Sequence, residues 1–218
     1  MIRRPPAERV SIAGPAGAIE AVVETPSDSA ASEFAVVCHP HPLHGGTLEN
    51  KVVHTLARAF EELGAATVRF NFRGVGASTG SFADGVGESE DASAVVAWGR
   101  RRWAGATLWL AGFSFGGAVA IRVAAAHRPA LLVTAAPAVQ RVDLTGAAMP
   151  DCPWLIVQGD SDDVVPRAEV QAWAARNAPW AELAVLPGVG HFFHGRLNEL
   201  RDSVIAFVAR LQKKSPAG

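Results

Sequence analysis

The 218-residue sequence predicts an α/β fold in which a mostly parallel sheet is covered by helices on both faces. Short apolar runs, typical of buried strands, alternate along the chain with longer stretches whose apolar residues recur at helical spacing. The composition is 49% hydrophobic and 19% charged, which provides enough apolar side chains for a large core. No internal repeat or low-complexity linker divides the chain, so residues 1–218 are expected to form a single domain.

The first half of the chain begins with an expected antiparallel hairpin, residues 9–26, at one edge of the sheet. The run "EFAVVCH" (33–39) is short, rich in β-branched residues and followed by a proline-rich loop, as expected for a strand. Residues 50–64 carry apolar side chains at helical spacing and end at a glycine, which is a typical helix stop. The alternating run "ATVRFNF" (66–72) is the next expected strand, and the glycines after it mark a long loop.

The second half of the chain repeats this order of strand and helix. After a helix at about residues 88–101, "ATLWLAGF" (106–113) has the composition of a buried strand, and the alanine-rich stretch 116–127 predicts a helix against the sheet. Three further strands are expected at residues 130–137, 153–160 and 181–188. One further helix is expected to begin at Pro166, since proline is tolerated in the first turn. The last helix is expected over the amphipathic stretch 197–212.

Charge and cysteine content exclude several classes of protein. Lys and Arg (20) nearly balance Asp and Glu (21), so the formal net charge is −1, and no basic stripe predicts nucleic-acid binding. No apolar run reaches the ~18 residues that a membrane span needs. Cys38 and Cys152 fit neither a disulfide framework nor a zinc pattern, so we expect reduced thiols in a cytoplasmic protein. We expect no cofactor.

A G-x-S-x-G motif, Gly112 to Gly116, lies at the junction between a predicted buried strand and a predicted helix. At such a junction a sharp turn holds the serine, here Ser114, in a strained conformation and exposes its Oγ above the sheet. The flanking glycines are needed because a side chain at either position collides with the neighbouring strand or helix. The alternative is that Ser114 only caps the helix, but a cap does not require glycine on both sides. Ser114 is therefore the predicted nucleophile.

A serine hydroxyl becomes a strong nucleophile only when a base accepts its proton and an acid orients that base. In a doubly wound sheet these partners come from loops at the carboxyl ends of later strands. The loop "QGDSDDVVP" offers three carboxylates, Asp160, Asp162 and Asp163, and the loop "PGVGHFFHG" offers two histidines. His191 directly follows the strand end and can reach over the serine, so it is the predicted base. His194 lies one turn further on, and we expect a structural role for it.

The blocks "HPHP", "RFNFRGVGAS", "GFSFGG", "QGDSDDVVP" and "GVGHFFHG" together resemble the α/β-hydrolase superfamily, and more closely a small bacterial branch of serine hydrolases without a lid. They span roughly residues 35–200. The resemblance implies an eight-stranded sheet whose second strand is antiparallel, and a Ser–Asp–His triad. It also implies that Asp162 is the acid, since the family pattern places this residue three positions before a Val-Pro pair. Asp160 and Asp163 are then expected to shape the loop or cap a helix.

The length of the segment between two of the expected strands indicates whether the chain can form a lid over the site. Many members of this superfamily insert one between the strand expected at 130–137 and the strand expected at 153–160. Only about fifteen residues separate these two strands here. We therefore expect no large lid, and an open, shallow site.

Acyl transfer also requires hydrogen-bond donors for the oxyanion of the tetrahedral intermediate. One is expected to be the backbone N–H of Phe115, which follows the nucleophile. The other is expected from the loop "HPHPLHGG", whose two prolines have no N–H to offer. This leaves the amides of His41 and Leu43, of which we favour His41. In a second register, Gly45 or Gly46 supplies the donor instead.

The same loop brings His39, His41 and His44 within six residues of each other, a spacing that raises the question of a metal ion. No H-E-x-x-H motif and no nearby carboxylate completes such a site. We therefore expect no metal, and we interpret the segment as an oxyanion loop whose backbone carries the chemistry.

These observations predict a carboxylesterase-like serine hydrolase that acts on small carboxylic esters through a covalent acyl-enzyme. Ser114, His191 and Asp162 are expected to be its triad, and a small-molecule acyl ester its partner. Two alternatives remain open: a thioesterase or peptidase that uses the same triad, and a non-catalytic binding protein with this fold. The sequence does not indicate an oligomeric state.

Overall fold

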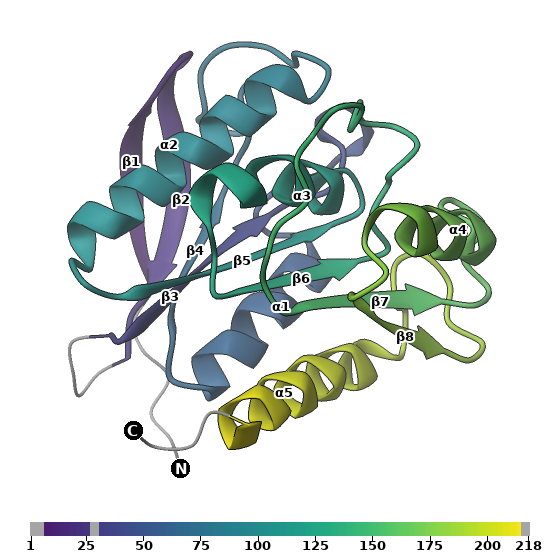
Figure 1. The fold of residues 1–218 in the computed structure, drawn as a ribbon. Helices are drawn as coiled ribbons and strands as arrows, with labels where there is room; N and C mark the ends of the chain where they lie inside the picture. The colour runs from purple at the N-terminus through teal and green to yellow at the C-terminus, as the bar shows by residue number, and fades with distance from the viewer. Residues whose placement is uncertain (1–6, 27–30, 215–218) are drawn as a thin grey trace.

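The computed structural model of the protein describes residues 7–26 and 31–214 (Figure 1). Residues 1–6, 27–30 and 215–218 of the expected domain lie outside the described residues. The described residues form one eight-stranded sheet with five α-helices. The strands are β1 (Ala7–Gly14), β2 (Gly17–Glu24), β3 (Glu33–Cys38), β4 (Ala66–Phe70), β5 (Thr107–Phe113), β6 (Leu131–Ala135), β7 (Trp154–Gly159) and β8 (Glu182–Leu186). The helices are α1 (Lys51–Glu62), α2 (Val86–Arg102), α3 (Phe115–His127), α4 (Arg167–Asn177) and α5 (Leu197–Lys214).

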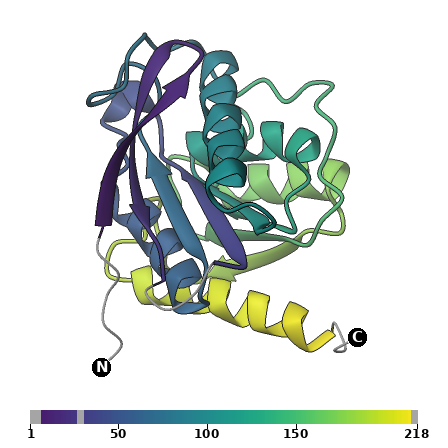
Figure 2. The same ribbon diagram turned by 90° about the vertical axis from the view of Figure 1, so that its left-hand side faces the viewer.

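The strands follow the order β1-β2-β4-β3-β5-β6-β7-β8 across the sheet. The second strand, β2, runs antiparallel to both of its neighbours, whereas every pairing from β4 to β8 is parallel. Figure 2 is viewed from the edge of the sheet that the β1–β2 hairpin forms. The predicted fold class is confirmed, including the edge hairpin and the antiparallel second strand.

Five strands, β3, β4, β6, β7 and β8, end one or two residues earlier than predicted, at the side of the sheet where the chemistry is expected. β3 ends at Cys38 and β4 ends at Phe70, one and two residues before the predicted ends. Beyond β4 the Asn71 N–H still donates to the carbonyl oxygen of Glu20 in β2 (2.8 Å), but the Phe72 N–H donates to the ring of His39 (3.0 Å), so the backbone leaves the ladder there. A short 3-10 helix, Pro42–His44, follows β3 and is not predicted from the sequence.

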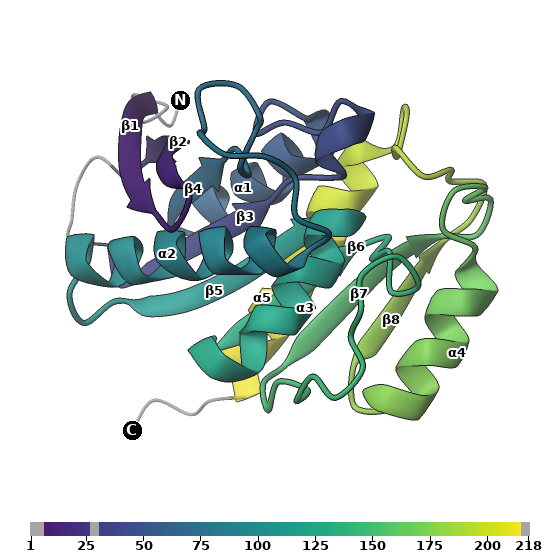
Figure 3. The ribbon, with the colours of Figure 1, turned by 90° about the horizontal axis from the view of Figure 1, so that it is seen from above.

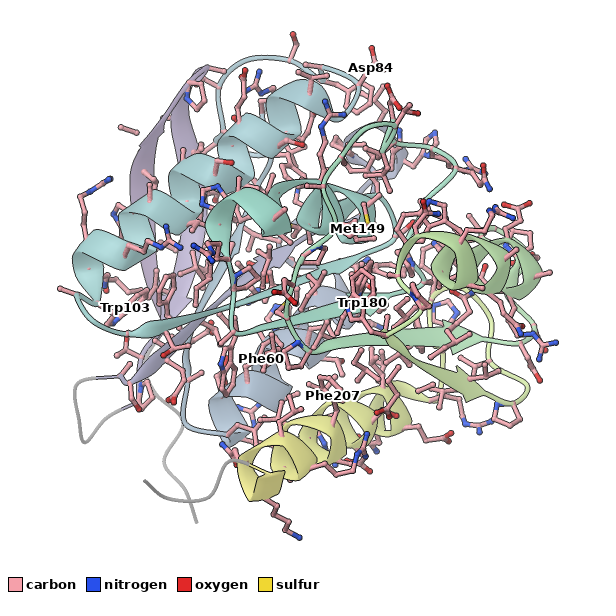
Figure 4. The ribbon with its side chains drawn as sticks, in the orientation of Figure 1. Phe60, Asp84, Trp103, Met149, Trp180 and Phe207 are labelled. Atoms are coloured by element: carbon pink, nitrogen blue, oxygen red, sulfur yellow. The ribbon has the colours of Figure 1, made fainter. Side chains whose placement is uncertain are left out.

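Helices cover both faces of the sheet, because each central strand is apolar on both sides. α2, α3 and α4 pack on one face, and α1 and α5 pack on the other, as the view from above shows (Figure 3). The strands alternate between the two layers: Val36 of β3 faces the first layer, and its neighbour Val37 faces the second. In Figure 4, Phe60 of α1 and Phe207 of α5 lie on the same side of the sheet.

The carboxyl ends of the parallel strands meet at one edge of the sheet, so the loops that follow β3, β5, β7 and β8 lie together there. Between β6 and β7, residues 136–153 are all described and form neither a helix nor a strand. The expected absence of a large lid is confirmed. Within residues 7–26 and 31–214, no helix combines the length and the apolarity that crossing a bilayer requires.

Candidate active site

Ser114 occupies the sharp turn between β5 and α3. Its backbone angles, φ 54° and ψ −117°, lie in a region that non-glycine residues rarely adopt. The flanking glycines make the turn possible, because a Cβ on Gly112 would lie 2.1 Å from the carbonyl oxygen of Gly116. A Cβ on Gly116 would in turn lie 2.3 Å from the carbonyl oxygen of His39. The Ser114 side chain makes no capping hydrogen bond, so the turn positions its hydroxyl without spending it on the helix.

Three of the predicted site residues lie in one hydrogen-bonded chain. His191 Nε2 is 3.1 Å from Ser114 Oγ, and His191 Nδ1 is 2.8 Å from Asp162 Oδ2. All three side chains are buried. A carboxylate can only accept, so Nδ1 carries the proton that bridges to Asp162. Nε2 of the neutral ring is then left unprotonated and faces the hydroxyl of Ser114, which is the orientation that a general base needs.

Asp162 is held by donors on both of its oxygens. Oδ1 accepts from the backbone amides of Val164 (2.9 Å) and Val165 (2.7 Å), and Oδ2 accepts from Gln158 Nε2 (3.0 Å) as well as from His191. Burial acts to raise the pKa of Asp162, but the hydrogen bonds from His191 and from the two amides outweigh it and hold the pKa below its usual value. The carboxylate therefore stays ionised beside the imidazole at neutral pH.

The two competing carboxylates have other surroundings. Asp160 is exposed, and its Oδ1 accepts from Ser161 Oγ (2.9 Å) and from the amide of Gly188 (2.7 Å), so it ties the loop after β7 to the loop after β8. Asp163 is also exposed and lines a neighbouring hollow rather than the cleft beside Ser114. Geometry alone thus places Asp162, and neither of the others, against His191.

The two histidines after β8 also differ. His191 is buried and contacts the ring of Phe113, with 5.0 Å between the ring centroids. His194 is exposed, and its ring stacks on the ring of Phe192 at the surface, with centroids 5.7 Å apart. The structure therefore brings His191 to the serine and leaves His194 outside the cleft.

The histidine rings of the loop after β3 organise the loop itself. The buried ring of His39 accepts the amide of Phe72 at Nε2 (3.0 Å) and contacts the carbonyl oxygen of Pro40 at Nδ1 (2.6 Å). The ring of His41 accepts the amide of Leu43 at Nδ1 (3.2 Å) and stacks on His44, with centroids 4.3 Å apart. Among the described residues, no group of three or more His, Cys, Asp or Glu side chains is placed to hold a metal ion.

His39 gives stability a pH dependence. Burial lowers the pKa of His39 to about 4, because a charged ring loses its hydration there. The neutral ring also accepts the amide of Phe72 at Nε2, which a protonated nitrogen cannot do. The unfolded chain binds the proton near pH 6.5, so unfolding takes up a proton between the two values and stability falls as the pH falls through this window. From pH 7 to pH 5, His39 alone is expected to lower the free energy of unfolding by about 2 kcal/mol.

Urea unfolding at pH 7 and at pH 5 measures this loss. His39→Gln has no titrating ring, so the difference between the two pH values is expected to shrink in the variant by about the same amount. An equal pH dependence in the wild type and in His39→Gln would contradict the assignment.

The amides expected to stabilise an oxyanion lie in the same region. No hydrogen bond to the N–H of Phe115 or of His41 is found among the described residues, so both are available to a ligand. Two of the alternative oxyanion donors already have partners. The Leu43 amide donates to the His41 ring, and the Gly46 amide donates to the His41 carbonyl oxygen (3.0 Å). Gly45 lies at the C-terminal end of the short 3-10 helix, in a left-handed conformation.

A small cleft of about 160 Å³ opens beside Ser114. Its walls come from the loop after β3, the start of α3, the segment 136–153 and the loops after β7 and β8. The lining residues are Pro40, His41, His44, Gly45, Gly46, Asn50, Ser114, Phe115, Ala138, Arg141, Val164, His191 and Phe192. None of them is an aspartate or a glutamate.

Two residues of this region, Gln158 and Arg141, are not predicted from the sequence. Gln158 supports Asp162, and although it stands in the quoted block "QGDSDDVVP", nothing in the sequence shows where its amide points. Arg141 lines the cleft from the segment 136–153, whose path no periodicity predicts. Their spatial neighbours, rather than their sequence neighbours, give them their places.

The chain is similar to one protein family and to several proteins of known structure. Residues 36–150 match the family model described as "Serine aminopeptidase, S33". An α/β serine hydrolase homologue from Coxiella burnetii is 47% identical, with 91% of this chain and 96% of that chain covered and a TM-score of 0.87. A lidless α/β serine hydrolase from Xanthomonas campestris is 39% identical, with 100% and 99% of the chains covered and a TM-score of 0.90.

One curated relative is similar over most of its length. An uncharacterised protein of Rickettsia prowazekii is 31% identical over 91% of this chain and 87% of its own. The family match and the solved structures agree with the fold, and the structure from Xanthomonas campestris agrees with the absence of a large lid. The chain thus belongs to the serine aminopeptidase S33 family of the α/β-hydrolase superfamily, among its lidless serine hydrolases.

Proposed function

We propose that the protein is a carboxylesterase-like serine hydrolase that cleaves small carboxylic esters through a covalent acyl-enzyme. The observation that carries this proposal is the hydrogen-bonded chain from Ser114 through His191 to Asp162, with Ser114 opening into a small cleft. A binding role alone would not need a buried carboxylate aligned on a histidine that faces a strained serine.

The proposed reaction has two stages. In the first, Ser114 Oγ attacks the ester carbonyl while its proton passes to His191 Nε2, and Asp162 stabilises the imidazolium that forms. The proton then passes from His191 to the departing alkoxide, which leaves as the alcohol and yields the acyl-serine. In the second stage His191 takes a proton from water, the water oxygen attacks the acyl carbon, and the carboxylic acid is released as Ser114 regains its proton.

The oxyanion of each tetrahedral intermediate is proposed to bind the amides of Phe115 and His41. Both N–H groups are free of partners among the described residues, and both residues line the cleft with Ser114. Each such donor contributes on the order of 3 kcal/mol to the stability of the transition state. Phe115 N–H also lies at the N-terminal end of α3, where the helix dipole favours negative charge.

Esters fit the cleft better than peptides with a free amino terminus. An aminopeptidase must bind the ammonium group of its substrate, for which a carboxylate is the natural partner. No aspartate or glutamate lines the cleft. A thioesterase uses the same triad and places no such demand on the cleft, so thioesters are the alternative that the experiment must separate.

Labelling with a fluorescent fluorophosphonate tests the proposal. The wild type is expected to become labelled, and Ser114→Ala is expected to lose the label entirely because the hydroxyl that faces His191 is gone. Ser161→Ala is the matched control, since Ser161 is exposed on the loop after β7. Its hydroxyl donates to Asp160, and its amide donates to the carbonyl oxygen of Val189. Labelling that survives in Ser114→Ala would remove the proposal.

A substrate panel then distinguishes the acyl classes. p-Nitrophenyl esters of short acids are expected to be turned over faster than the matched acyl thioesters and the aminoacyl p-nitroanilides. Faster turnover of the thioesters would favour the thioesterase alternative. Labelling without turnover of any of the three would favour a binding role.

We also place the protein in the cytoplasm. Cys38 and Cys152 are both free, and burial raises the pKa of the Cys152 thiol to about 11. Free, protonated thiols are typical of a reducing compartment.

A further inference from the structure

The charged and polar side chains that line the cleft beside Ser114 favour a negatively charged ligand. Arg141 is the one permanently charged residue among those that line it, and no lining residue is an aspartate or a glutamate. The other polar side chains outside the triad are His41, His44 and Asn50, which all carry N–H donors. A substrate in this cleft therefore meets a cation and several donors, with no carboxylate to balance them.

Arg141 has no carboxylate partner among the described residues. The one hydrogen bond that its side chain makes among these residues is a long one, 3.5 Å from Nη2 to the carbonyl oxygen of Val164, which also lines the cleft. Asp163 and Glu169 line an adjoining hollow together with Arg141, but neither forms an ion pair with it. Exposed arginines without partners are common; Arg141 differs in that it stands beside the proposed nucleophile.

The two histidines of the cleft cannot balance the positive charge of Arg141, because a histidine side chain is either neutral or positive. Burial and the charges of His44 and Arg141 lower the pKa of His41, and the negative charge of Asp84 opposes them. Asp84, labelled near the top of Figure 4, does not line the cleft. Because His41 Nδ1 accepts the amide of Leu43, the neutral ring keeps its proton on Nε2, as one more donor at this wall.

Part of the cleft lining is apolar. Val164 is 36% exposed and Phe192 is 48% exposed, although both side chains are hydrophobic. Exposed apolar side chains that line a cleft are typical of a binding surface for a carbon skeleton. The cleft thus offers exposed apolar side chains and a guanidinium together with the same serine.

We infer that the substrates are esters that also carry a carboxylate, and that Arg141 is the residue that binds this carboxylate. The inference rests on the esterase function proposed above. In the bound ester, the carbonyl faces Ser114, the carbon skeleton contacts Val164 and Phe192, and the carboxylate pairs with the guanidinium, whose fork can hold both oxygens.

Matched pairs of esters test the inference. One pair is 4-acetoxybenzoate and 4-acetoxybenzamide, with the anion on the alcohol side; the other is monomethyl glutarate and methyl glutaramate, with the anion on the acyl side. At low ionic strength the wild type is expected to favour the anionic member of at least one pair by about fivefold in kcat/KM. Added salt is expected to reduce the preference, because an exposed pair is screened.

Variants at position 141 identify the residue responsible. In Arg141→Gln the preference for the anionic ester is expected to vanish, and Arg141→Lys is expected to keep part of it. Arg101→Gln is the control, since it removes the same charge from an exposed position in the last turn of α2 and is expected to leave the preference intact.

The outcomes separate this inference from the proposed function. If the wild type cleaves the neutral esters but shows no preference in either pair, or if Arg141→Gln keeps the preference, the inference is wrong and the esterase function stands. If the wild type turns over p-nitrophenyl esters but none of the four esters, the inference is wrong and the esterase function stands; if it cleaves neither kind, the esterase function is wrong and the inference falls with it.

Discussion

His191→Ala is expected to lower kcat for a p-nitrophenyl ester by about 10⁵-fold or more, because Ser114 then has no base. His191 Nε2 is 3.1 Å from Ser114 Oγ, and no other side chain among the described residues hydrogen-bonds this oxygen. Stopped assays of kcat and KM measure the loss. Most of it is expected in kcat, since the imidazole acts on the reacting atoms.

The control is His194→Ala, which removes the same ring from three residues further along the same loop. His194 is exposed and contacts Phe192, so its loss is expected to change kcat by less than about tenfold. Circular dichroism and urea unfolding of both variants show whether the fold is retained. An equal or larger loss in His194→Ala would mean that the wrong histidine has been assigned.

Asp162→Asn is expected to lower kcat by about 10⁴-fold near neutral pH while the fold survives. The backbone amides of Val164 and Val165 donate to Oδ1, so the asparagine oxygen must stay on that side and its NH₂ group must face His191. A donor there forces Nδ1 to accept, and the ring proton moves to Nε2. The imidazole then points an N–H at Ser114 and cannot take the proton of the hydroxyl.

The same substitution at Asp160 and Asp163 tests the choice among the three carboxylates. Asp160 ties two loops together and Asp163 faces a different hollow, so each asparagine variant is expected to lose less than about tenfold in kcat. A loss in Asp160→Asn as large as that in Asp162→Asn would reverse the assignment. The pH dependence of kcat in Asp162→Asn gives a second readout, because hydroxide can replace the lost base as the pH rises.

Ser114 and the loops that carry Asp162 and His191 can be located in the sequence because each directly follows an apolar strand. The strand fixes where the loop begins, and parallel strands bring their carboxyl ends to one edge. The choice of Asp162 among three nearby carboxylates depends on family resemblance, since residues 160–163 occupy one short loop. Only the backbone path of this loop shows which side chain turns inward to His191.

Other features depend on contacts between distant parts of the chain. The early end of β4 follows from the bond between Phe72 and the ring of His39, residues that lie 33 positions apart. The histidine spacing in the loop after β3 is a local pattern, but the partners of the rings are not. The support of Asp162 by Gln158 and the place of Arg141 in the cleft likewise require the folded arrangement.

At position 114 chemical reactivity and folding stability oppose each other. A non-glycine residue at φ 54° and ψ −117° costs about 1–3 kcal/mol, which is a substantial part of the 5–15 kcal/mol by which a typical domain is stable. The turn persists because the Ser114 N–H donates to the Ala135 carbonyl oxygen (2.9 Å) and the Ser114 carbonyl oxygen accepts from Ala118 and Ala138. Glycine at this position is expected to remove both the strain and the hydroxyl, and so to give a more stable protein that lacks the proposed nucleophile.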